Sequence, residues 1–86
     1  MRITREEIAD IIPDALFADG FDEAIIGYIQ RFELMVVLYD ARKCIEILMV
    51  NDNMSEEEAI EYFEYNVLGA WVGDNTPAFA FLEGYL

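Results

Sequence analysis

The 86-residue chain contains no histidine and a single cysteine, Cys44. Histidine is the commonest general base and metal ligand, so its absence excludes a Ser-His or Cys-His dyad and a histidine-ligated metal site. One cysteine excludes an internal disulfide and a cysteine zinc cluster. A glycine-rich phosphate loop is missing too. We therefore expect a protein that is not an enzyme and that uses no cofactor and no metal.

Basic residues are also scarce. Five lysines and arginines stand against 18 aspartates and glutamates, which gives a net charge of −13. Phosphates need lysine and arginine to neutralise them, so direct binding of nucleic acid or of an anionic membrane surface is disfavoured. The same charge favours a basic partner, including proteins that normally hold DNA or RNA. Solubility alone is the alternative reason for such a charge.

Long apolar runs and an N-terminal signal segment are absent as well, which predicts a cytoplasmic protein without a membrane span. Yet the apolar share is 56%, above the ~45–50% that is usual in soluble proteins. Residues 1–86 make one small domain, whose core is too small to hide all of these side chains. We therefore expect a surface that binds a partner, with a homodimer as the first expectation.

Local signals in the first half of the chain predict one helix and two strands. Segment 4–12 begins with a capping box and ends before Pro13, as a short helix does. Segments 24–32 and 34–39 read as antiparallel strands joined by a tight hairpin. Gly27 predicts a bulge or close packing in the first strand. The second strand has no polar alternation, which suits a strand that is covered on both faces or lies at a subunit contact.

Two further helices and a third strand are predicted in the second half. Segment 41–49 carries a helical apolar stripe that includes Cys44, which we expect to be a buried thiol. Ser55 opens the next helix with a second capping box, and Gly69 and Gly73 bracket its expected end. Segment 76–82 reads as a strand. The predicted fold is therefore a single α+β domain in the order α-β-β-α-α-β, a three-stranded antiparallel sheet packed with helices.

The helix that Ser55 opens carries the sharpest candidate for a binding site. Glu57, Glu61 and Glu64 lie at i, i+4 and i+7, so they line up on one face in steps of roughly 5–6 Å. Phosphates along a nucleic-acid strand recur at a comparable spacing, and such a row can imitate them. No lysine four residues away balances these charges, whereas an ordinary surface helix usually mixes signs. A merely solvated face is the alternative.

Aromatic residues accompany this acidic stripe. Tyrosine and tryptophan anchor interfaces because they bury much area yet keep a polar tip. Packing at the edge of the core is the alternative for these side chains. Asn66 is expected to face inward, where a buried amide would hydrogen-bond to nearby backbone. The candidate partner-binding set is Glu57, Glu61, Glu64, Tyr62, Tyr65 and Trp71.

A second group of carboxylates surrounds the turn at Asp19 and Gly20. Its spacing does not match a calcium-binding EF-hand loop, which needs oxygen ligands at alternate positions. Solvation of a loop is the interpretation that we favour. The alternative is a metal-assisted hydrolase that uses Asp14, Asp19, Asp22 and Glu23.

The pattern "YDARKCIEILM…MSEEEAIEYFEYNVLGAWVG…TPAF" (39–79), with "DGFDEAIIG" (19–27), resembles a group of small proteins that tailed bacteriophages encode and that recur in viral metagenomes. The resemblance carries no catalytic or binding assignment. It implies a phage gene product that acts in the bacterial cytoplasm, where such proteins often inhibit a host protein and acidic ones sometimes mimic nucleic acid. We therefore expect an acidic accessory protein that binds a host protein, such as a defence factor. A homo-oligomeric assembly module is the alternative.

Overall fold

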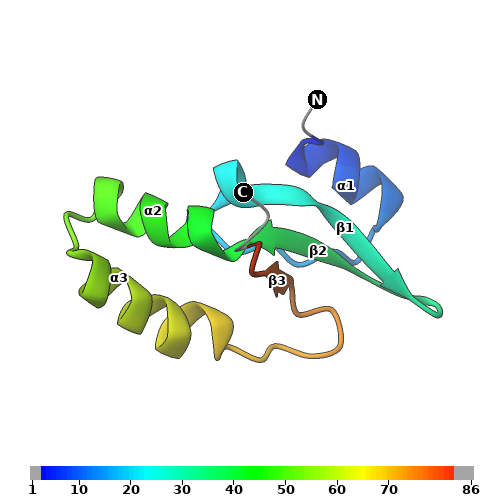
Figure 1. The fold of residues 1–86 in the computed structure, drawn as a ribbon. Coiled ribbons are helices and arrows are strands. Elements are labelled where there is room, and N and C mark those ends of the chain that lie inside the picture. Colours follow the sequence, from blue (N-terminus) through cyan, green and yellow to red (C-terminus); the bar gives the residue numbers. More distant parts are fainter. Residues whose placement is uncertain (1–2, 83–86) are drawn as a thin grey trace.

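The computed structural model describes residues 3–82, and its elements follow the predicted order (Figure 1). The α+β class and the single small domain with three helices and a three-stranded sheet are as expected. Within the described part, no helix has the length and apolar character that crossing a bilayer requires. The elements are α1 (Arg5–Ile11), the 3₁₀ turn η1 (Asp22–Ala24), β1 (Ile25–Arg31), β2 (Leu34–Asp40), α2 (Ala41–Asn51), α3 (Glu56–Tyr62), the π-helical segment η2 (Phe63–Leu68) and β3 (Ala78–Ala80).

The sheet has the strand order β1-β2-β3, with β2 in the centre. β1 pairs with β2 in the antiparallel direction, and the register shifts between Ile25 and Gly27 as a bulge, which confirms the prediction for Gly27. β3 pairs with β2 in the parallel direction, with Phe79 beside Tyr39. The sheet is therefore mixed, and the antiparallel expectation does not hold for β3. Parallel neighbours need a long crossover, which α2 and α3 supply.

Both predicted capping boxes are present. The hydroxyl of Thr4 accepts a hydrogen bond from the Glu7 amide at 3.1 Å, and the Glu7 carboxylate accepts one from the Thr4 amide at 2.7 Å. Ser55 and Glu58 make the same pair of bonds at 3.2 and 2.9 Å. These bonds satisfy amides that would otherwise lack a partner at the start of a helix. The starts of α1 and α3 therefore follow from local sequence.

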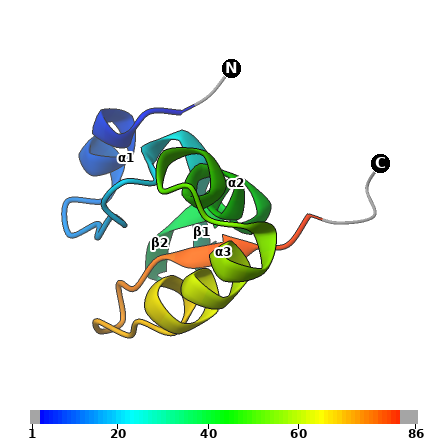
Figure 2. The ribbon, with the colours of Figure 1, turned by 90° about the vertical axis from the view of Figure 1, so that its left-hand side faces the viewer.

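The apolar core lies on one face of the sheet. Val37 and Tyr39 of β2 are fully buried in it, together with Phe63. Phe79 stacks on Tyr39 with ring centroids 5.5 Å apart and meets Phe63 edge-on at 5.3 Å. The Tyr39 hydroxyl accepts a hydrogen bond from the Ala18 amide at 2.7 Å, which fastens the loop after α1 over the core. Both views place α1 and α3 at opposite ends of the molecule (Figures 1 and 2).

Cys44 is a buried free thiol, as predicted. Burial, and then the charge of the Asp40 carboxylate, raises the pKa of Cys44 to about 12. A thiol with such a pKa stays protonated at neutral pH and is a poor nucleophile. Burial also raises the pKa of the Tyr39 hydroxyl, so both groups are held in their neutral forms.

Candidate partner-binding surface

The three glutamates of the acidic stripe lie on α3 and on η2, which continues it. Glu57, Glu61 and Glu64 are all exposed. Among residues 3–82, none of the three takes part in a salt bridge or a side-chain hydrogen bond. Arg42 of α2 instead pairs with Glu56, the first residue of α3, at 3.0 Å. The charge of the stripe is therefore uncompensated within the described chain, and a basic partner could contact it.

The π-helical turn changes the direction of the side chains that follow Phe63. The amide of Gly69 donates to the carbonyl of Glu64 at 3.1 Å, a hydrogen bond that reaches five residues back. Because each such turn holds more residues than an α-helical turn, Asn66 is rotated away from the core and is exposed. The expectation of a buried Asn66 was wrong, and Val67 packs against the core instead. Turns of this kind are frequent at functional sites.

Glu61, Tyr62 and Tyr65 line one shallow hollow, which we call the α3 hollow and whose volume is about 500 Å³. Tyr62 is 42% exposed and Tyr65 is 77% exposed, so neither ring is held in the core. The structure thus joins one glutamate of the stripe to two of the predicted aromatic residues. The remaining lining residues of the α3 hollow are Asp52, Asn53, Met54, Glu58 and Asn66.

Trp71 lies apart from this group. It follows η2 in the chain and is 72% exposed, yet it does not line the α3 hollow. The segment that follows it is held by Thr76, whose hydroxyl accepts from the Val72 amide at 2.9 Å and donates to the Gly73 carbonyl at 2.6 Å. Trp71 is therefore an exposed aromatic residue, as an interface residue would be, but it does not share the α3 hollow with Glu61, Tyr62 and Tyr65.

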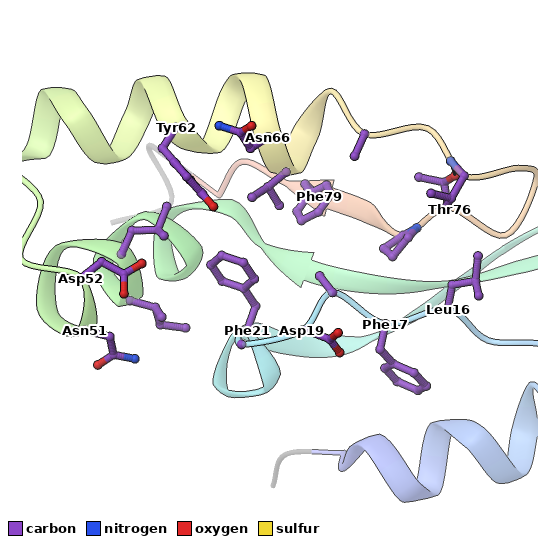
Figure 3. Close-up of a pocket in the computed structure, with 18 residues that line it drawn as sticks. Leu16, Phe17, Asp19, Phe21, Asn51, Asp52, Tyr62, Asn66, Thr76 and Phe79 are labelled. Carbon is purple, nitrogen blue, oxygen red and sulfur yellow. Dashed lines mark hydrogen bonds between the residues drawn. The ribbon is translucent and has the colours of Figure 1, made fainter.

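A second hollow, of about 440 Å³, lies between the loop after α1 and the segment after η2. Figure 3 shows Phe21 and Phe79 near its centre, with Tyr62 projecting toward it from α3. This hollow was not predicted from the sequence, because segment 14–23 was interpreted only as an acidic loop. The signal was present in Phe17 and Phe21, two large apolar residues among the carboxylates. Such an apolar floor suits an apolar group rather than a charged one.

The carboxylates of the loop after α1 are balanced in part by a cation of α1. Arg5 pairs with Asp22 at 3.0 Å and with Asp19 at 3.8 Å, and its guanidinium lies over the Phe17 ring at 4.5 Å. In the described part of the chain, no three or more carboxylates and cysteines gather where they could hold a metal ion. Pairing with Arg5 is the structural role that these contacts give to Asp19 and Asp22.

Comparisons with protein-family models, with curated proteins and with solved structures gave no match to this chain. The resemblance to phage proteins therefore stays a prediction from the sequence.

Proposed function

We propose that this chain is a non-enzymatic acidic protein that binds a basic partner protein through the outer surface of α3 and η2. The observation that carries the proposal is the meeting of uncompensated charge with exposed aromatic area. Glu61 lines the same hollow as Tyr62 and Tyr65. Glu57 and Glu64 extend the charge along the same helix and have no partner among the described residues.

Charge and aromatic contact would contribute differently to such a complex. An exposed ion pair is worth roughly 0.2–1 kcal/mol, so three glutamates give at most about 3 kcal/mol, or roughly 150-fold in affinity. A micromolar complex needs about 8 kcal/mol, so most of the affinity has to come from buried contact. Tyr62 and Tyr65 are the exposed aromatic residues placed to supply it. The glutamates would chiefly steer the encounter.

The partner that fits this surface is a host protein with a basic, nucleic-acid-binding groove. Along a helix that rises about 1.5 Å per residue, Glu57 and Glu61 stand about 6 Å apart, as a row of anionic groups. Occupation of the groove by this row would exclude nucleic acid and inhibit the host protein. With the phage resemblance of the sequence, we place this inhibition in the cytoplasm of a bacterial host, with a defence factor as one such target.

Capture from a bacterial lysate tests the proposal. The immobilised chain should retain a nucleic-acid-binding protein at about 50 mM salt and lose it at about 500 mM, because salt screens exposed charges. Duplex DNA or RNA added at low salt should release the same protein, since both ligands would compete for one basic groove. Retention that neither salt nor nucleic acid disturbs would contradict the proposal, and so would the absence of any retained protein.

A further inference from the structure

The sheet has a second face, opposite the core. Successive residues of a strand point to opposite sides, so residues that alternate with Val37 and Tyr39 lie on that second face. The register places Ile29 beside Val36 and Arg31 beside Leu34 there. It places Ala78 beside Leu38 on the same side. We call this surface the open face and define it by Ile29, Arg31, Leu34, Val36, Leu38, Ala78 and Ala80.

The helices do not bury their side chains against the open face. Every buried residue of the described helices belongs to the core cluster that contains Val37 and Tyr39. Val36 is only 8% exposed but lies outside that cluster, while Ile29 and Leu34 are 41% and 42% exposed. In Figure 1 the β1–β2 hairpin also extends away from α2 and α3. The exposed part of this face is its hairpin end, at Ile29, Arg31 and Leu34, whereas Leu38, Ala78 and Ala80 are half-buried. A solvated sheet face is normally polar, and this exposed part is largely apolar.

The open face is also almost free of charge, although the chain carries −13. Arg31 is its one charged member. Asp40 ends β2 on the same side, but its carboxylate accepts hydrogen bonds from the Arg42 and Lys43 amides and so caps α2. Two copies of the chain repel each other across most other orientations, because both are strongly acidic. Contact between two open faces brings together the surfaces that repel least.

We propose that the open faces of two copies pack against each other in a two-fold symmetric dimer. Two sheets can pack face to face at about 10 Å, and a second copy provides an identical face. The two sheets would form the inner layers and the helices the outer ones. Both α3 hollows would then stay exposed, so the dimer would present two partner-binding surfaces. The proposal does not depend on what those surfaces bind.

The hairpin turn supplies an independent observation. Phe32 is 86% exposed and has a φ of 57°, although a two-residue turn with positive φ favours glycine, asparagine or aspartate. The Phe32 ring adds little to the stability of the isolated chain, because the ring is exposed and the backbone at this residue is strained. Phe32 follows Arg31 and precedes Leu34 by two residues, at the end of the open face. Cover from the second copy would explain why an aromatic residue occupies this position.

The size of the open face sets the strength of the dimer. Seven residues at about 3.3 Å each give strands of about 23 Å, and two such strands plus the short β3 cover roughly 300 Å². Two copies would bury at most about 600 Å² from the sheet faces, less than the ~1,200–2,000 Å² of stable complexes, because Val36 is already covered within each chain. Phe32 and other residues at the edge of the open face add to this area. We therefore expect a dissociation constant of roughly 10–100 µM.

Sedimentation equilibrium of the full chain tests the dimer. Ile29→Lys places a charge on the open face, and Ile11→Lys is its matched control, because Ile11 is 43% exposed on α1 and the change in charge is the same. Ile29→Lys should weaken association by about tenfold or more, and Ile11→Lys should leave it unchanged. Added salt should tighten the dimer of the unmodified chain, since it screens the repulsion between two acidic copies.

Either of two results would overturn the dimer. One is a chain that stays monomeric at several times the expected dissociation constant, and the other is equal association of the two lysine variants. Circular dichroism shows whether each variant is folded. If Ile29→Lys does not fold, Leu34→Lys replaces it, because Leu34 is exposed to the same degree on the neighbouring strand. A folded Leu34→Lys variant that dimerises like the unmodified chain would equally contradict the proposal.

Discussion

Replacement of Phe32 separates the strain of the hairpin turn from the contacts of its side chain. An L-residue in the left-handed region destabilises the folded chain by roughly 1–2 kcal/mol, and glycine adopts that region without this cost. Glycine also makes the unfolded chain more flexible, which lowers the free energy of unfolding by roughly 0.4–1 kcal/mol. Because Phe32 is 86% exposed, loss of its ring removes little burial. Phe32→Gly should therefore raise the free energy of unfolding of the monomer by about 1 kcal/mol.

Thermal unfolding followed by circular dichroism measures this gain. In a domain of this size, about 1 kcal/mol raises the Tm by roughly 4–8 °C. The protein concentration should lie well below the dissociation constant of the dimer, so that only the monomer is measured. Phe32→Ala is the control, because it removes the ring but keeps a Cβ atom at positive φ, and it should gain nothing. A Tm that is unchanged or lowered in Phe32→Gly, or raised equally in both variants, would refute the reasoning.

Two further predictions concern a glycine pair and alkaline pH. Gly69→Ala should destabilise the fold by roughly 1–3 kcal/mol, because its Cβ would lie 3.0 Å from the Glu64 carbonyl oxygen. Gly27→Ala should be neutral or stabilising by up to ~1 kcal/mol, because its Cβ would meet nothing closer than 3.9 Å. Urea unfolding measures the stability of both variants, and equal effects would contradict the packing argument. The Cys44 thiol is neutral when protonated, and folding raises its pKa from 9.0 to about 12. Its contribution to the free energy of unfolding is therefore complete below pH 9 and falls by about 4 kcal/mol as the pH approaches 12. Stability measured from pH 7 to 11 should therefore decline more steeply in the unmodified chain than in Cys44→Ala, and parallel curves would show that the thiol is not responsible.

The parts of the fold that depend on neighbouring residues could be predicted from the sequence. The capping boxes at Thr4 and Ser55 involve residues only three positions apart, and a glycine inside a strand indicated the bulge beside Gly27. The direction of β3 could not be predicted, because it depends on where α2 and α3 carry the chain and not on the three residues of β3. Asn66 was placed wrongly because helical periodicity of 3.6 does not describe a π-helical turn.

For the candidate site too, the features that depend on neighbouring residues could be predicted from the sequence, and those that depend on the path of the chain could not. Glu61, Tyr62 and Tyr65 belong to one continuous helix, so their shared surface follows from spacing along that helix. Trp71 lies beyond the end of the helix, in a segment whose path depends on the hydrogen bonds of Thr76. The sequence indicated the open face only in part. The absence of polar alternation in β2 allowed either two covered faces or a subunit contact. In the structure both Val36 and Val37 are buried, while Leu34 at the hairpin end of the open face is exposed.

The comparison of two matched triple variants in the lysate capture tests the acidic stripe most directly. One variant neutralises the stripe, and the other neutralises three exposed aspartates that lie elsewhere and have no side-chain partner among the described residues. Each removes three negative charges and moves the net charge from −13 to −10. The stripe variant is Glu57→Gln with Glu61→Gln and Glu64→Gln, and the control is Asp10→Asn with Asp14→Asn and Asp74→Asn.

If α3 and η2 form the binding surface, the stripe variant should lose most of the captured partner while the control retains it, with both variants folded by circular dichroism. The loss of affinity should lie between roughly threefold and the roughly 150-fold that three exposed ion pairs contribute at most. Equal capture by the two variants would contradict the account, because the stripe would then matter only through its contribution to net charge.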